Sequence, residues 1–302
     1  MRVYKKIIFL SLTIGLFILQ NSIAFAEEEI QKTFDKKKEI EIKCVLGGCE
    51  ILKSKDNKIH VDLIYSYDEE DFKAEFEERG DKLVIEEEIY GNNSNGHSHW
   101  KIYIPDGMEV DFESATGGLT VEGVDADLEG SSGTGSMTLI NIKGEYEVSS
   151  GTGSVKLSDS EGEFELSSGT GRIRIEDSKG IFEGSSGTGS VKAENIIIED
   201  EADFSSGTGS VNVTLIKGKD FELNLGSGTG SVELDLGGKK IDGYYEFTTN
   251  ARNGKIDSPY KFDNEEEFWE GNAEKVKKSF TIGKSATRIY LSSGTGRVKL
   301  EK

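Results

Sequence analysis

The sequence predicts an all-β protein, a single-stack parallel β-solenoid (β-helix-like) with about 18–21 residues per coil. The tetrad Ser-Gly-Thr-Gly recurs at this near-constant spacing through the second half of the chain, and once more close to its end. Repeats of this length are typical of solenoids, in which each coil buries its apolar face by stacking on its neighbours. Between the tetrads, apolar and polar residues alternate over short stretches, which indicates strands with one buried face. The tetrads begin at Ser132, Ser150, Ser168, Ser186, Ser206, Ser227 and Ser293.

The coil that starts at Ser154 illustrates the predicted unit. Val155 and Leu157 face inward from a first strand, and Phe164 and Leu166 face inward from a second. We expect each Gly-Thr-Gly to form a sharp corner, because glycine tolerates the positive φ that such a turn uses. Stacking then places equivalent residues of successive coils about 4.8 Å apart, so that every repeated column becomes a ladder.

The N-terminal segment, up to Ala26, has the pattern of a secretory signal peptide. Basic residues between Arg2 and Lys6 precede an apolar run from Ile7 to Gln20, and Ala24-Phe25-Ala26 is a small-x-small cleavage site. An uncleaved anchor is the alternative, because the apolar run and the cleavage site together make about 20 residues, just enough to span a bilayer. We expect cleavage before Glu27, no stable membrane insertion afterwards, and a secreted or cell-envelope location.

After the signal peptide, residues 1–26, we expect one solenoid domain. It comprises residues 27–302, divided into an N-terminal β region with the first coils (27–110), the regular repeats (111–257), and a C-terminal excursion with a closing coil (258–302).

The C-terminal excursion contains a charged stretch, Asp263 to Ser279, that matches no repeat. We expect a loop or short helix that covers the end of the solenoid, with the last coil, Arg288 to Lys302, beneath it. A partner site at Trp269 is the alternative.

The repeated tetrad does not predict catalysis. A phosphate-binding loop needs a lysine and a following helix, and a nucleophile needs a unique base and orienter. All three histidines, His60, His97 and His99, precede the first tetrad. We therefore expect a protein that is not an enzyme and has no metal site and no cofactor. The alternative is a secreted carbohydrate-active β-solenoid enzyme.

The chain is strongly acidic. Its net charge of −20 falls to −23 when Arg2, Lys5 and Lys6 leave with the signal peptide. Such a chain has no footprint for nucleic acid and is repelled by anionic lipid. We expect its partner to be an envelope component, a basic peptide or a basic protein, and divalent cations also match its charge.

Carboxylates recur at outward positions before each tetrad, and they predict two ladders on one sheet. A solvated face that prevents aggregation is the alternative explanation. The candidate binding residues are Glu129, Glu147, Glu165, Glu183 and Asp203 in the first ladder and Glu145 and Glu163 in the second, which also contains Asp127, Glu201 and Glu222. The opposite strand carries Thr138, Lys156, Arg174, Lys192 and Asn212, so we expect an electrically two-faced molecule.

The order of the remaining motifs resembles a known family. The segment from Lys38 to Ile51 is followed by Gly80 to Ile85, then by Trp100 to Val110 and the repeats, and the segment from Ile282 to Leu300 closes the chain. In this order the chain resembles the bacterial putative adhesin family of extracellular β-strand repeat proteins, a domain of unknown function common in Gram-positive envelopes. The resemblance covers nearly all of the chain after the signal peptide.

This resemblance implies an elongated solenoid with an envelope or secreted role and without catalytic residues. It aligns Cys44 with Ser149 and Cys49 with Ser154, on either side of a corner in the first coil. Because an exported chain meets an oxidising environment, we expect a disulfide between Cys44 and Cys49 that staples this end coil.

Together these features predict an exported, non-enzymatic cell-envelope binding, adhesin-like or scaffold protein. Its acidic face would engage cationic ligands or a partner domain.

Overall fold

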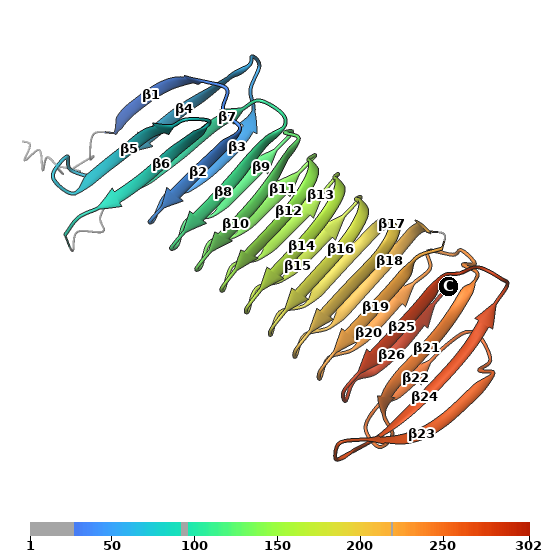
Figure 1. The fold of residues 1–302 in the computed structure, drawn as a ribbon. Coiled ribbons are helices and arrows are strands. Elements are labelled where there is room, and N and C mark those ends of the chain that lie inside the picture. Colours follow the sequence, from blue (N-terminus) through green and yellow to red (C-terminus); the bar gives the residue numbers. More distant parts are fainter. Residues whose placement is uncertain (1–26, 92–95, 219) are drawn as a thin grey trace, which may run out of the picture.

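In a computed structural model the protein is an elongated stack, and the 26 strands of its described residues form one continuous sheet (Figure 1). The structure describes residues 27–91, 96–218 and 220–302, and these ranges contain no helix, so none that could cross a membrane. The all-β prediction is confirmed. The predicted signal peptide, residues 1–26, lies outside the described residues.

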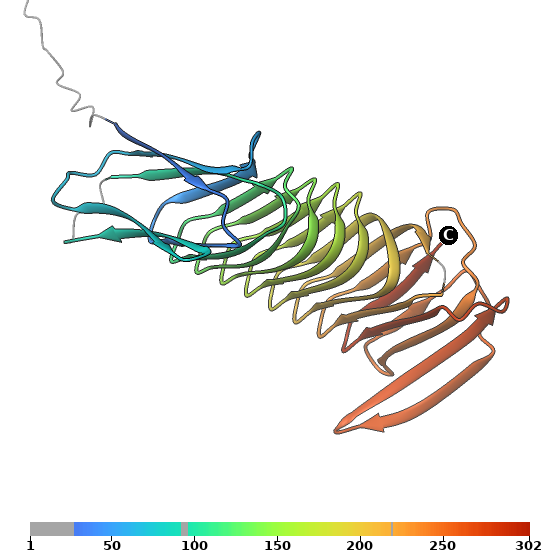
Figure 2. The same cartoon turned by 45° about the horizontal axis from the view of Figure 1, so that its top comes forward.

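Each coil of the central stack consists of a long strand, a corner, a short strand and a turn (Figure 2). Long strands pair in parallel on one face and short strands on the other, and β17 (Val191–Ser206) belongs to both. The long strands are β8 (Met108–Ser114), β10 (Ala126–Ser132), β12 (Lys143–Ser150), β14 (Glu161–Ser168), β16 (Lys179–Ser186) and β19 (Glu222–Ser227). The short strands are β9 (Leu119–Glu122), β11 (Met137–Ile140), β13 (Val155–Ser158), β15 (Ile173–Glu176), β18 (Val211–Gly218) and β20 (Val232–Asp235).

The predicted apolar columns fill the inside of the stack. Val155, Leu157, Phe164 and Leu166 are all buried. The aromatic members of one column stack along the axis, with ring centroids of Phe164 and Phe182 5.7 Å apart. Each such side chain stabilises the fold by about 1.5–3 kcal/mol when it leaves water. Because a slip of one residue would turn a whole column outward, these residues also determine the register of the strands.

The first serine of each tetrad is buried and connects two coils. The Ser168 hydroxyl accepts a hydrogen bond from the N–H of Gly171 in its own corner and donates one to the carbonyl of Gly153 in the preceding coil, both at 2.8 Å. The same two bonds recur at Ser132, Ser150, Ser186, Ser206, Ser227 and Ser293. These hydroxyls form one row, the serine row, which gives partners to the buried polar groups of the corners.

The corner glycines are needed for a different reason than the predicted one, since none of them has a positive φ. The coils approach closely at the corners instead. A Cβ on Gly153 would lie 2.0 Å from the carbonyl oxygen of Gly135, and one on Gly151 would lie 2.4 Å from that of Gly133. The second position is glycine in every stacked corner, whereas the first position accepts Ala115 in the variant corner. Thr152, between the two glycines, is exposed.

Left-handed backbone occurs at the opposite turn. Asn141, Asp159, Asp177 and Asn195 have φ values of 50°, 56°, 49° and 58°. Asparagine and aspartate tolerate this region because their short polar side chains bond locally to the backbone. This turn column recurs once in each of these coils, so the sequence carried this signal as well.

The first coil of the chain is not the outermost one. Its strands β2 (Glu39–Cys44) and β3 (Gly48–Lys53) lie between β6–β7 and β8–β9, in parallel with both. Strand β5 pairs antiparallel with β6, and β4 pairs antiparallel with β1 and β7. A purely parallel stack was therefore wrong at this end, because hairpins supply its outer strands. The bounds are β1 (Glu28–Asp35), β4 (Lys58–Tyr65), β5 (Phe72–Arg79), β6 (Lys82–Ile89) and β7 (Ser98–Ile104).

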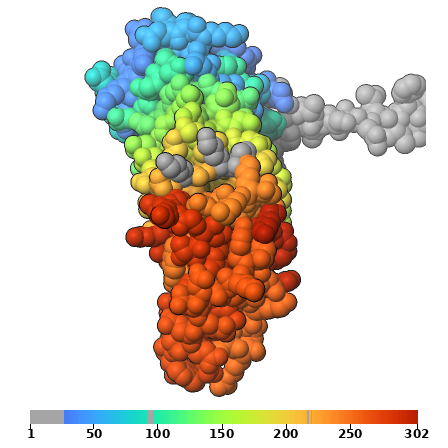
Figure 3. Space-filling model, turned by 90° about the vertical axis from the view of Figure 1, so that its right-hand side faces the viewer, coloured from blue at the N-terminus to red at the C-terminus, as the bar shows by residue number. Residues whose placement is uncertain are grey.

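The C-terminal end has the same arrangement. The last coil, β25 (Arg288–Ser293) and β26 (Arg297–Glu301), lies between β19–β20 and the outer pair β21 (Gly243–Asn250) and β22 (Lys255–Asp257). We call residues 243–282 the cap. Figure 3 shows the cap in orange at this end of the molecule, with the dark red atoms of the last coil next to it. The last coil therefore lies inside the stack, covered directly by β21 and β22.

The predicted loop or short helix at this end is wrong. Strands β23 (Asn264–Glu270) and β24 (Ala273–Ile282) form an antiparallel hairpin beside β21. Its many charges pair across the strands, for example Glu265 with Lys278 at 2.9 Å. Trp269, 64% exposed, lies near the hairpin tip, and a partner site there stays a prediction.

Aromatic side chains close both ends of the core. At the N-terminal end, the ring of Phe76 lies 6.0 Å from those of Phe34 and Trp100. At the C-terminal end, Phe280 stacks on Tyr245 at 4.8 Å. These rings cover apolar surface that the terminal coils would otherwise expose.

Replacing Ser168 by alanine should lower the free energy of unfolding by about 1–3 kcal/mol, because it leaves the Gly171 N–H and the Gly153 carbonyl buried without this partner. Urea unfolding measures the change. The control is Ser167→Ala, which removes a partly exposed hydroxyl and should cost less than about 0.5 kcal/mol. Equal effects of the two substitutions would contradict the role of the serine row.

Gly153→Ala should destabilise the protein by at least about 1–3 kcal/mol, because the added Cβ collides with the backbone of the preceding corner. Thr152→Ala, one residue earlier and exposed, should be close to neutral. Thermal unfolding followed by circular dichroism compares the two. If the Gly153 variant were as stable as the Thr152 variant, the corners would have space for a Cβ, and the steric role of Gly153 would be contradicted.

Candidate functional site

The outer face of the long-strand sheet is hollowed into one open groove of about 760 Å³. It extends from Glu39, at the start of the first coil, across the long strands from β8 to β17, and it ends at Asn224 on β19. Twelve of its lining residues are acidic and none is basic, within the part of the chain that the structure describes. We call it the acidic groove. The acidic residues are Glu39, Glu109, Asp111, Asp127, Glu129, Glu145, Glu147, Glu163, Glu165, Glu183, Glu201 and Asp203.

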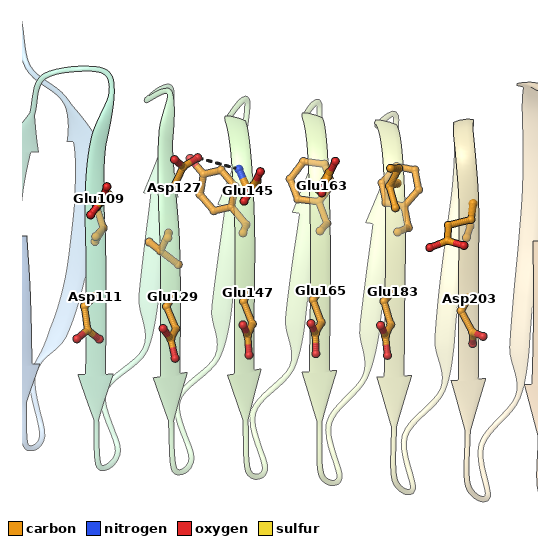
Figure 4. Close-up of a pocket in the computed structure, with 18 of the residues that line it drawn as sticks. Glu109, Asp111, Asp127, Glu129, Glu145, Glu147, Glu163, Glu165, Glu183 and Asp203 are labelled. Carbon is orange, nitrogen blue, oxygen red and sulfur yellow. Dashed lines mark hydrogen bonds between the residues drawn. The ribbon is translucent and has the colours of Figure 1, made fainter. Parts of the chain in front are cut away.

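The first row of carboxylates runs in register along the groove (Figure 4). It contains all five predicted members, from Glu129 to Asp203. It also contains Asp111, which lies on β8 beside Glu129 of β10. Sequence reasoning missed Asp111 because the tetrad of its coil is the variant that begins at Ser114. Each member of the row lies four residues before the first corner glycine, and Asp111 lies four residues before Ala115, which takes the place of that glycine.

The second row is shorter than predicted. Glu109, Asp127, Glu145 and Glu163 follow one another along the groove (Figure 4). The Glu145 N–H also donates a hydrogen bond to the Asp127 carboxylate at 3.1 Å. The partner of Glu163 in the next coil is Ile181, and the register shifts between β16 and β17 just after it. The row is therefore interrupted before Glu201.

The two faces of the solenoid differ in how their charges are balanced. The seven predicted carboxylates form no ion pair within the described ranges. On the short-strand face, Arg174 pairs with Glu176 at 2.7 Å and Glu194 at 3.4 Å, and Lys192 pairs with Glu194 at 2.8 Å. The predicted basic face is thus neutralised by acidic neighbours, because glutamates follow these cations on the same strands. In the acidic groove, two of the twelve carboxylates form ion pairs within the described residues, Glu39 with Lys82 at 2.7 Å and Glu109 with Lys38 at 2.9 Å, and both lie at its N-terminal end.

The groove raises the pKa of two of its acids. Burial raises the pKa of Asp111 above its ordinary value, and the nearby Glu113 and Glu41 carboxylates raise it further. Burial likewise raises the pKa of Asp203, with a contribution from Glu201. Two like charges about 4 Å apart repel by about 1 kcal/mol even in water. A bound cation would relieve this repulsion.

The chemistry that the first row supports is electrostatic. An acid–base pair needs two carboxylates whose surroundings push their pKa values apart. Glu129, Glu147, Glu165 and Glu183 instead occupy equivalent positions on successive coils. Across the described residues, no group of three His, Cys, Asp or Glu side chains is arranged to hold a metal ion. The arrangement suits a ligand with several positive charges along its length.

Comparison with known proteins decides the family. The family described as Toastrack DUF4097 matches residues 37–257, which is well over half of the chain. The chain belongs to the Toastrack DUF4097 family. This confirms the resemblance drawn from the motif order, and the Toastrack match contains the whole acidic groove.

Three solved structures are similar to this Toastrack chain, each over 91% of its length. A putative cell adhesion protein from Clostridium sporogenes is 15% identical, with 99% of that chain covered and a TM-score of 0.30. Putative adhesins from Bacteroides fragilis and Parabacteroides merdae are 12% and 10% identical, with 98% and 96% covered and TM-scores of 0.34 and 0.38. Likeness at this level does not establish a ligand. No curated protein matches the chain.

Cys44 and Cys49 flank the corner of the first Toastrack coil, and both side chains face the core. Each lies one residue away from its predicted register, because Gly47 rather than Gly48 occupies the place of the second corner glycine. Cys44 is consequently the neighbour of Ser114, which continues the serine row in the variant corner and accepts a hydrogen bond from the Gly117 N–H at 2.8 Å. Cys49 lies in the apolar column that follows the corner.

Both cysteines are buried free thiols in the structure. Burial raises the pKa of the Cys44 thiol well above its ordinary value, with smaller contributions from Cys49 and Glu87. The disulfide between Cys44 and Cys49 is not formed here and stays a prediction for the oxidised protein.

Glu87 caps the serine row at its N-terminal end. Its carboxylate is buried and accepts hydrogen bonds from the N–H groups of Val45, Leu46 and Gly47 at 2.6, 3.1 and 3.2 Å. These amides belong to the corner in which a thiol replaces the serine hydroxyl. Sequence reasoning missed Glu87 because it lies in a run of three glutamates, which is typical of a solvated strand face.

Asp111→Asn should stabilise the protein at pH 7 by less than about 1 kcal/mol, since the side chain is partly solvated. The folded-state pKa of Asp111 lies above its ordinary value of 3.8, so ionisation disfavours the folded state. This cost is present above the folded-state pKa and disappears as the pH falls below the unfolded-state pKa. Thermal unfolding between pH 7 and pH 3 should therefore show a difference that shrinks towards zero. A variant less stable than the parent at pH 7 would contradict this assignment.

Proposed function

We propose that this protein is an exported, non-enzymatic binding or scaffold protein of the cell envelope, adhesin-like in role. It uses the acidic groove to hold a cationic ligand or the basic surface of a partner domain. The observation that supports the proposal is the groove, whose lining carries twelve carboxylates and, within the described residues, no basic side chain. Export is inferred from the N-terminal sequence pattern.

The solenoid holds these carboxylates in place before any ligand arrives. Glu147, Glu165 and Glu183 are held by strands that pair on both sides, so their backbones lose little freedom on binding. Adjacent carboxylates lie on strands about 4.8 Å apart, and a flexible chain of ammonium or guanidinium groups can follow them. Attraction of this kind accelerates encounter and weakens with salt.

The combined substitutions Glu147→Gln, Glu165→Gln and Glu183→Gln should weaken binding of a ten-lysine peptide by about 3- to 100-fold at low salt. Each exposed ion pair contributes about 0.2–1 kcal/mol, and about 1.4 kcal/mol corresponds to a tenfold change in Kd. Titration calorimetry of the full chain, at salt concentrations of about 0.02 M and about 0.2 M, measures the effect and its screening.

The matched control removes the same charge elsewhere. Glu265→Gln, Glu266→Gln and Glu267→Gln lie on β23, outside the groove lining, and should leave the affinity nearly unchanged. If the groove variant bound as tightly as the parent, or if both variants lost affinity equally, the groove would be a solvated face and not a binding site.

A further inference from the structure

The last coil is inserted between strands that precede it in the chain. After β20 the chain builds β21 to β24 and then returns to place β25 and β26 inside the stack (Figure 1). All six residues of strand β25 pair in parallel with β19 on one side and with β21 on the other. Strand β26 pairs with β20 on one side and β22 on the other. We call the space that this coil fills the terminal slot.

The terminal slot recognises features that every repeat shares. Ile289 and Leu291 are completely buried in it. The Ser293 hydroxyl donates a hydrogen bond to the Gly230 carbonyl at 2.9 Å, and the Thr249 hydroxyl donates one to the Gly296 carbonyl at 3.1 Å. All these contacts come from residues 288–301 and from the slot strands. A coil of the same sequence from another molecule would therefore make the same contacts.

One short loop connects this coil to its own cap. Residues 283–287 join β24 to β25, and Asp220 holds the loop in place. The Asp220 carboxylate accepts hydrogen bonds from the Ser285 hydroxyl at 2.9 Å and from the Ala286 N–H at 3.1 Å. The Asp220 N–H donates to the Thr287 hydroxyl at 2.9 Å. The loop alone determines which molecule supplies the coil.

We propose that the terminal slot also accepts the last coil of a second copy of this chain, so that two molecules pair by exchanging residues 288–302. Exchange preserves the contacts of the coil and changes only the loop, which is the condition under which segment swapping costs little. The groove lining ends at Asn224 on β19, so exchange leaves the acidic groove open. The inference is independent of the function proposed for the groove.

A pair of cysteines can report which molecule supplies the coil. Asn224 and Tyr290 are parallel partners on β19 and β25, and strands about 4.8 Å apart are within reach of a disulfide. The full chain would carry Asn224→Cys and Tyr290→Cys, with Cys44→Ser and Cys49→Ala to remove the natural thiols. It is refolded from denaturant at low and at high protein concentration and then oxidised.

We expect monomers with an internal disulfide after refolding at low concentration. At high concentration we expect dimers whose two chains stay covalently linked on a non-reducing gel. Asp220→Gly, which removes the acceptor that holds the loop but tolerates the φ of 56° at this position, should raise the dimer fraction further. Size-exclusion chromatography of the natural chain, refolded in the same way, should show the same rise of dimer with concentration.

The control pair is Glu129→Cys with Glu147→Cys, parallel partners on β10 and β12 in the middle of the stack. Its disulfide should be internal at every concentration, because these strands are joined by a continuous run of coils. Absence of covalent dimers at all concentrations would overturn the proposal. So would dimers in which the 224–290 disulfide is internal, or covalent dimers that are equally abundant with the control pair.

Discussion

The hydrogen-bonded serine row is the interaction on which the rest of the structure depends. A corner between two stacked strands presents a buried N–H that needs an acceptor and a buried carbonyl that needs a donor. A serine hydroxyl supplies both from one small group, as Ser168 does between Gly171 and Gly153. The glycines beside it allow the corners to approach closely enough for the second bond. In the regular repeats, the serine and the glycines together satisfy the polar groups of the corner and allow the coils to stack closely.

The ends of the serine row show what the row requires. At the N-terminal end Cys44 replaces the serine, and the buried carboxylate of Glu87 accepts the corner amides instead. At the C-terminal end Thr249 donates to the corner of the last coil. At each end, a different polar group therefore bonds to the corner where the repeat stops. Hairpins with aromatic side chains cover the apolar core of the terminal coils. The ends are therefore stabilised by these capping hydrogen bonds and aromatic contacts, which the repeat does not supply.

The acidic groove is a consequence of the same stacking. Once the corners determine the register, outward residues at one repeat position become neighbours, and like charges are held side by side. Ion pairs relieve this repulsion on the short-strand face, where Arg174 contacts two glutamates. Within the described residues, Glu147 and Glu165 form no ion pair. The apolar core and the hydrogen-bonded strands must therefore offset the repulsion between neighbouring carboxylates. A surface that keeps unneutralised charge at the expense of stability is well suited to attract an oppositely charged partner.

Features that follow from the repeat period could be predicted from the amino-acid sequence. In a parallel stack the repeat length along the chain is also the step between neighbours, so the columns of Val155 and Phe164 and the first row from Glu129 to Asp203 could be predicted. Other features depend on contacts between residues that the period does not relate, and these appear only in the folded chain. These are the place of the last coil, which pairs with strands far earlier in the chain, the reason for the corner glycines, and the capping by Glu87. A period reveals equivalent positions, but only the folded chain shows which backbone atoms meet and how close they come.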